Sequence, residues 1–94
     1  MSRQDRIGSH ATTISRDVNG YTSVIYHTTP VVRFNHNEII LNSGGWLTPT
    51  TKTRMNQASN EYGLGYEVFQ KDYDWYVRYR GKTKLFHDGI RLPR

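Results

Sequence analysis

One part of the chain, between residues 48 and 63, carries apolar positions at helical spacing. Thr48 suits the N-cap, because its hydroxyl can accept a hydrogen bond from the first turn, and Pro49 suits the first helical position; the alternative is that Thr50 or Thr51 caps a helix that begins slightly later. Gly63 can adopt the left-handed conformation that ends a helix. The face expected to enter a core is formed by Thr51, Met55, Ala58 and Tyr62. The face expected to remain polar is formed by Thr53, Asn56, Gln57, Asn60 and Glu61.

A turn is predicted just before this helix, at Gly44 and Gly45, since neither residue has a Cβ that forbids positive φ. Trp46 follows, and its size predicts an apolar anchor for the start of the helix.

The segments on either side of the helix are rich in β-branched and aromatic residues and alternate with period two, as strands do. Asn35, His36 and Asn37 form one predicted turn, and Asp88 with Gly89 form a strong hairpin signal. Pro30 predicts a turn or a bend at a sheet edge, because proline cannot donate to a ladder. The predicted strands are 21–28, 31–35, 38–42, 66–71, 75–80, 84–87 and 90–92.

The order of these elements is three strands, one helix, and three or four strands. It predicts an α+β fold, in which an antiparallel sheet of about five to seven short strands carries one amphipathic helix on one face. Residues 21–94 form the single domain. Residues 1–20 are polar and without period, which predicts a flexible N-terminal arm; the alternatives are an arm that orders on a partner, or partly cloning sequence at Gly8-Ser9-His10.

The alternation in 75–80 assigns two faces to that strand. The apolar set is expected to pack on the helix and consists of Trp75, Val77 and Tyr79. The opposite set is expected to meet solvent or a ligand and consists of Tyr76, Arg78 and Arg80.

The composition narrows the protein class. The 94 residues fit one domain, and a 13% aromatic content partly offsets a low apolar fraction of 35%. The chain has no cysteine, which excludes disulfides, thiolate zinc sites and thiol nucleophiles. No apolar run approaches the roughly 18 residues of a membrane span. A soluble, intracellular protein is expected.

The net charge of +5 is confined to the C-terminal quarter. From Arg78 onward the sequence holds six basic residues and one acidic residue, Asp88, whereas the charges of residues 1–77 sum to zero. A basic end on a neutral body favours an anionic partner, most often nucleic acid. The alternative is that these charges protect exposed sheet edges and keep the protein soluble.

The predicted nucleic-acid site combines an aromatic platform with cations, because bases stack on rings while cations neutralise phosphates. Its main residues are Tyr76, Arg78, Arg80, Lys82 and Lys84. The alternative is that the exposed aromatic residues serve cross-strand pairing only. Lys52 and Arg54 at the helix start are secondary candidates, which lie about 200° apart around the helix and would flank a phosphate. A solvated, capped helix start is the alternative there.

The sequence does not favour an enzyme, and no cofactor or metal is expected. The histidines share no metal-ligand spacing, and His87 and Asp88 belong to a turn. Asp72 and Asp74 could hold a divalent ion, but paired aspartates in a hairpin loop usually serve the turn.

The motif LNSGGW at 41–46, with TTKTRMNQ at 50–57, YEVFQK at 66–71 and WYV at 75–77, resembles small uncharacterised proteins of tailed bacteriophages and prophages. The resemblance implies a phage accessory protein of the bacterial host cytoplasm, and it implies no site residues. Such proteins bind nucleic acid or block a host protein. Three functions stay open: nucleic-acid binding, inhibition of a host defence or nucleic-acid-processing protein through an acidic partner site, and a homo-oligomeric structural role.

Overall fold

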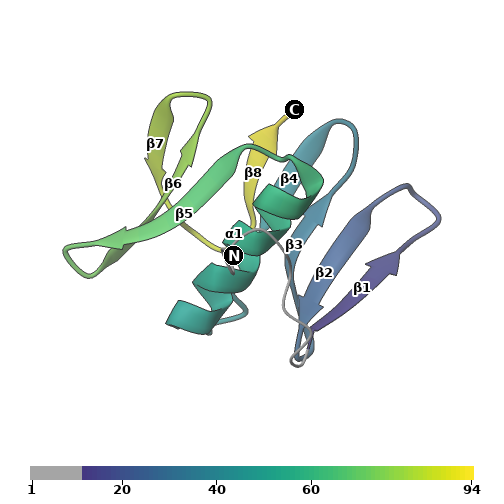
Figure 1. Ribbon diagram of the computed structural model, residues 1–94, viewed down its shortest axis with the longest axis horizontal. Helices are drawn as coiled ribbons and strands as arrows, with labels where there is room; N and C mark the ends of the chain where they lie inside the picture. Colours follow the sequence, from purple (N-terminus) through teal and green to yellow (C-terminus); the bar gives the residue numbers. More distant parts are fainter. Residues whose placement is uncertain (1–11) are drawn as a thin grey trace.

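The computed structural model describes residues 12–94 (Figure 1). Within them the chain forms one helix, α1 (Pro49–Tyr62). The strands are β1 (Thr12–Arg16), β2 (Thr22–Tyr26), β3 (Thr29–Phe34), β4 (Glu38–Leu41), β5 (Tyr66–Lys71), β6 (Asp74–Tyr79), β7 (Lys82–Leu85) and β8 (Ile90–Pro93).

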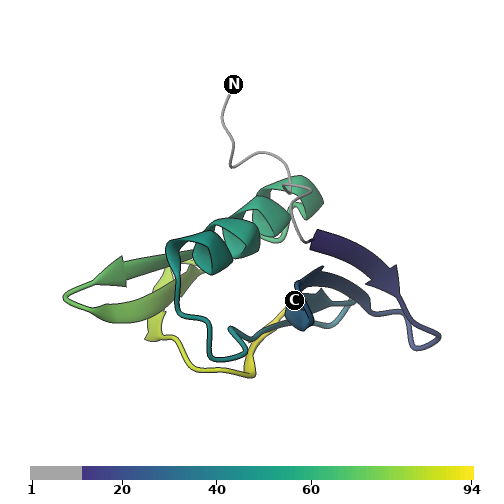
Figure 2. The ribbon, with the colours of Figure 1, turned by 90° about the horizontal axis from the view of Figure 1, so that it is seen from below.

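The strands divide into two antiparallel sheets. A five-stranded sheet has the order β1-β2-β3-β4-β8, and a three-stranded sheet has the order β5-β6-β7. Helix α1 lies across one face of the larger sheet, and β5 runs back beside it (Figures 1 and 2). The predicted α+β class, with antiparallel strands and one helix packed on a sheet face, is confirmed. The second sheet is a feature that the pattern of the sequence did not separate from the first.

Helix α1 begins and ends as its sequence predicts. The Thr48 hydroxyl accepts a hydrogen bond from the backbone N–H of Thr51 at 3.2 Å, and Pro49 occupies the first turn. Gly63 ends the helix with φ 63° and ψ 37° in the left-handed region. Thr51, Met55 and Ala58 of the predicted core face are fully buried, and Tyr62, its fourth residue, is half-buried at the edge of the core.

Gln57 was predicted on the polar face of α1 but is buried. Its side-chain oxygen accepts a hydrogen bond from the Arg54 guanidinium at 3.0 Å, which satisfies a polar group away from water. Helical periodicity alone did not reveal this burial, because a glutamine is compatible with either environment.

The core lies between α1 and the two sheets. Alternate residues on the inner faces of the strands are buried against the helix, and Trp75 packs against Phe86 with ring centroids 5.6 Å apart. The strand side chains with 0% exposure are Val24, Val32, Ile39, Leu41 and Leu92. Trp75 and Val77 are buried as predicted, while Tyr79 is half-buried at the edge of the core.

Polar side chains of α1 complete the free edge of β5. The Asn56 amide donates to the carbonyl of Val68 at 2.9 Å and accepts from the N–H of Val68 at 2.8 Å. The Ser59 hydroxyl does the same for Tyr66, at 2.7 and 3.0 Å. The helix therefore takes the place of a neighbouring strand, and buried backbone groups remain paired.

The predicted arm is shorter than expected, because Thr12–Arg16 forms strand β1 and pairs with β2 along its whole length. Polar residues dominate this strand because it lies at the sheet edge, so the segment lacks a buried face and the apolar period that would reveal it. Residues 1–11 of the predicted arm lie outside the described residues.

Pro30 lies inside strand β3 rather than in a turn or at a sheet edge. The register between β2 and β3 shifts after Val24, so that Ile25 faces Pro30 and Val31 is the extra residue of a bulge. A bulge is one of the positions where a strand tolerates proline.

The predicted hairpin across Asp88 and Gly89 is wrong. β7 pairs with β6 in the smaller sheet, whereas β8 pairs with β4 in the larger one. The Asp88 carboxylate instead accepts hydrogen bonds from the N–H and the hydroxyl of Ser43, at 2.8 and 2.7 Å. The Asp-Gly pair thus makes a contact with a residue distant in the chain. Local turn propensity alone cannot distinguish this arrangement from a hairpin.

Candidate nucleic-acid interface

The predicted ligand face of β6 is divided by a tight turn. Arg80 and Gly81 have φ of 51° and 76°, and Tyr79 pairs with Lys82, so these two residues form the loop of the β6–β7 hairpin. Two positive φ values identify a type I′ turn. Arg80 therefore leaves the ladder, and its side chain does not continue the face of Tyr76 and Arg78 as alternation predicted.

Register places the two lysines on the opposite face from Arg78. Lys82 pairs with Tyr79 and Lys84 pairs with Val77, and cross-strand partners share a face. Arg78 shares its face with Tyr76 and with Thr83, its partner on β7. The predicted set of five residues is thus split into two groups on the two faces of the smaller sheet.

The first group lines a small hollow, which we call the basic hollow. It has a volume of about 220 Å³ and lies where β6 and β7 meet β8. It is lined by Val77, Tyr79, Arg80, Lys82, Lys84, Leu92 and Pro93. The Tyr79 hydroxyl donates to the carbonyl of Pro93 at 2.8 Å, which ties the hairpin to the larger sheet beside the three cations.

The cations of the basic hollow are not neutralised by carboxylates. Within residues 12–94, Lys82 and Lys84 have no ion pair, and Arg80 has only its position over the Tyr79 ring, 5.1 Å from the centroid. All three residues are exposed. Their charges are therefore available to an anionic ligand.

Other arginines are already paired. Arg33 binds Asp17 at 2.8 Å, and Arg91 binds Glu38 at 2.7 Å. The hydrogen bond from Arg33 holds the pKa of Asp17 below its usual value. The pKa of Glu38 is lowered first by a hydrogen bond from the Tyr21 hydroxyl and then by one from Arg91. In these pairs the positive charge of each arginine is neutralised by a carboxylate of the protein, so less positive charge is left for an anionic ligand.

The second group lies on what we call the outer face of the smaller sheet. Tyr76 stacks on Phe69 with ring centroids 5.7 Å apart, and Arg78 lies over Phe69 at 5.0 Å. Leu85 beside them is 59% exposed. Arg78 also contacts Glu67 at 3.3 Å, so its charge is partly neutralised. The outer face is aromatic but less basic than predicted.

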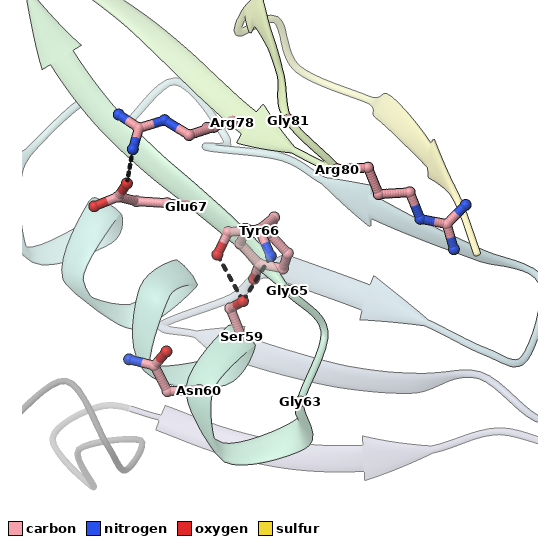
Figure 3. A pocket seen from close by; sticks show the side chains of 9 residues that line it. All are labelled: Ser59, Asn60, Gly63, Gly65, Tyr66, Glu67, Arg78, Arg80 and Gly81. Atoms are coloured by element: carbon pink, nitrogen blue, oxygen red, sulfur yellow. Dashed lines mark hydrogen bonds and ion pairs between the residues drawn. The ribbon is translucent and has the colours of Figure 1, made fainter.

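A hollow of about 470 Å³ at the C-terminal end of α1 is lined by both Arg78 and Arg80 (Figure 3). Arg78 reaches toward Glu67 on one side of it, while Arg80 points away on the other. The remaining polar groups there are engaged in structure, since Ser59 binds Tyr66. The two guanidinium groups therefore point in different directions, although both residues line this hollow.

The secondary candidates lie on separate sides of α1, as the helical angle predicted. The Lys52 ammonium is 5.6 Å from the centroid of the Trp75 ring. The Arg54 guanidinium is 5.6 Å from the centroid of Tyr26 and donates to the Thr12 hydroxyl at 3.1 Å. Each is therefore associated with a different sheet. The amide of Asn56, on the same helix, binds the backbone of Val68.

Trp46 was predicted as an anchor but is 60% exposed, and its neighbour Leu47 is 59% exposed. Trp46 lines a hollow with a volume of about 560 Å³, which we call the aromatic hollow. Its lining residues are Tyr26, His27, Trp46, Thr48 and Thr50. Sequence reasoning missed this cluster because Tyr26 and His27 are distant in the chain, and a tryptophan after a turn usually predicts burial.

The described residues were also compared with the requirements of a metal site and of a membrane-spanning helix. Among residues 12–94 there is no group of three or more histidine, cysteine or acidic side chains that could hold a metal ion. In the same range α1 is too short and too polar to cross a membrane.

A family model described as Kyanoviridae Gp96 protein matches residues 1–93, and the chain belongs to this family. The prediction of a phage protein is therefore confirmed. No curated protein and no solved structure matches the chain.

Proposed function

We propose that this phage protein binds single-stranded nucleic acid without catalysing a reaction, and that the basic hollow contacts the phosphates. The observation that carries the proposal is that Arg80, Lys82 and Lys84 gather at one exposed site and have no carboxylate partner among residues 12–94. Cations in this arrangement release counterions when they neutralise phosphates, which drives nucleic-acid binding.

The outer face supports single strands as the preferred form. The stacked pair of Phe69 and Tyr76 offers a ring surface for unpaired bases, with Leu85 exposed beside it. The bases of a duplex are already stacked on one another and would gain no stacking energy from these rings. The expected location of the protein is the cytoplasm of the bacterial host, where phage nucleic acid is accessible to it.

Removal of two cations from the basic hollow is the direct test. Exposed ion pairs are worth up to about 1 kcal/mol each, so Lys82→Ala with Lys84→Ala is expected to weaken binding about tenfold at low salt. The measurement is fluorescence anisotropy of a labelled single-stranded oligonucleotide.

The matched control removes two exposed charges elsewhere, Arg16→Ala with Lys71→Ala, and keeps the same net charge as the test variant. This control is expected to bind nearly as tightly as the unchanged chain. Equal weakening in both variants would show that binding depends on overall charge rather than on the basic hollow.

A host-protein inhibitor and a homo-oligomer remain the alternative functions. A bacterial partner that is captured equally well after nuclease treatment, by a chain that binds no oligonucleotide, would favour the inhibitor. A molecular mass above that of one chain in size-exclusion measurements would favour the oligomer.

A further inference from the structure

The loop that carries Trp46 is held in place by hydrogen bonds. The N–H of Gly44 donates to the Asn42 side chain at 2.7 Å, the N–H of Gly45 donates to the Ser43 hydroxyl at 3.1 Å, and the N–H of Trp46 donates to the Ser43 carbonyl at 3.0 Å. Ser43 is buried and is fixed in turn by Asp88. Trp46 is therefore displayed to solvent by a well-ordered turn, rather than by a loose segment.

Gly44 seats this loop on the β2–β3 hairpin. It has a φ of 64°, and a Cβ at this position would lie 2.4 Å from the Thr29 hydroxyl oxygen, so only glycine fits without a shift. This contact brings Trp46 to the same hollow as Tyr26 and His27, the residues that enter the hairpin turn.

The rings on the hairpin side also have a defined arrangement. The ring centroids of Tyr26 and His27 are 4.4 Å apart, and His27 has a φ of 58° in a two-residue turn where glycine is usual. This turn fixes the backbone at His27, so the two rings are presented from a defined hairpin end.

The charge around the aromatic hollow favours an anionic ligand. Among the residues that the structure describes, no acidic side chain lines it, and α1 has no acidic residue in its first turn. Arg54 lies over the Tyr26 ring, 5.6 Å from its centroid. An apolar peptide would gain from the rings alone, whereas a nucleotide would gain from both the rings and the cation.

We infer that the aromatic hollow is a second nucleic-acid contact, in which an unpaired base stacks on Trp46 and its phosphate lies toward Arg54. The inference rests on the proposed function for the identity of the ligand. It adds a base-binding site that shares no residue with the basic hollow.

The test compares an oligothymidylate with an abasic oligonucleotide of equal length, which keeps the phosphates and lacks the bases. Stacking is worth about 1–3 kcal/mol per base, so Trp46→Ala is expected to weaken oligothymidylate binding at least about fivefold. Binding of the abasic strand is expected to be unchanged. Leu47→Ala is the matched control, because Leu47 is equally exposed but does not line the hollow.

Tryptophan fluorescence gives a second readout. The chain has two tryptophans, and Trp75 is buried at 7% exposure, so a Trp75→Phe variant reports Trp46 alone. Oligothymidylate is expected to quench this emission, and the abasic strand is not.

The outcomes separate this inference from the proposed function. If Trp46→Ala binds oligothymidylate normally while Lys82→Ala with Lys84→Ala weakens it, the aromatic hollow is not a base site and the basic hollow stands. If oligothymidylate quenches the Trp46 emission and Lys82→Ala with Lys84→Ala binds normally, the proposal for the basic hollow is wrong and the base site at the aromatic hollow is supported. If neither strand binds, or if Trp46→Ala loses only a nuclease-resistant protein partner, the inference is overturned.

Discussion

Replacement of Met55 by alanine is expected to lower the free energy of unfolding by about 2–5 kcal/mol. Met55 is fully buried on the core face of α1, between the helix and the sheets. Truncation removes apolar contacts and leaves a cavity that the surrounding strands fill only in part. For a domain of this size, whose total stability is about 5–15 kcal/mol, such a loss is severe.

Urea unfolding followed by circular dichroism measures this effect. Met55→Leu is the control, because a swap that conserves volume usually costs less than about 1.5 kcal/mol. A loss below about 1 kcal/mol for Met55→Ala would contradict the packing of α1 against the sheets.

Replacement of Asn56 by alanine is expected to cost about 2–4 kcal/mol, although the residue is only half-buried. Both hydrogen-bonding groups of its amide pair with the backbone of Val68, at 2.9 and 2.8 Å. Val68 itself is 1% exposed, so removal of the amide leaves two backbone groups without a partner and with little access to water.

Two variants make the Asn56 prediction specific. Asn56→Asp keeps an acceptor for the N–H of Val68 but loses the donor to its carbonyl, so an intermediate loss of stability is expected. Asn60→Ala changes an exposed residue one turn later and is expected to cost little. If the three variants unfold at the same urea concentration, the helix does not complete the edge of β5 as described.

The sequence predicted the elements that depend on local rules. The N-cap at Thr48, the core face around Met55 and the left-handed Gly63 all follow from positions within a few residues of one another. The β5–β6 hairpin follows from alternation and a short polar loop. These signals are local, and the structure confirms each of them.

The sequence did not predict the features that depend on long-range contacts. The division into two sheets depends on whether β8 pairs with β7 or with β4, and the Asp88 side chain, which binds Ser43, suited either arrangement. The same limit applied to the candidate site. Arg80 and Arg78 are two residues apart, so alternation placed them together, but the positive φ of Arg80 separates them.

The aromatic hollow shows the limit most clearly. Its rings come from Tyr26, His27 and Trp46, which meet because Gly44 packs on Thr29. The two glycines before Trp46 were a visible signal, since they predicted a tight turn, but the turn alone did not say whether the tryptophan would face the core or the solvent.

The salt dependence of single-strand binding tests the central claim most directly. Fluorescence anisotropy titrations at several salt concentrations, with single-stranded DNA, duplex DNA and RNA, give the slope of log affinity against log salt. Three phosphate contacts by Arg80, Lys82 and Lys84 predict a slope of about −2 for a single strand, falling to about −0.7 in the Lys82→Ala, Lys84→Ala variant. A slope near zero, or no binding at low salt, would contradict the proposal that the basic hollow binds nucleic acid.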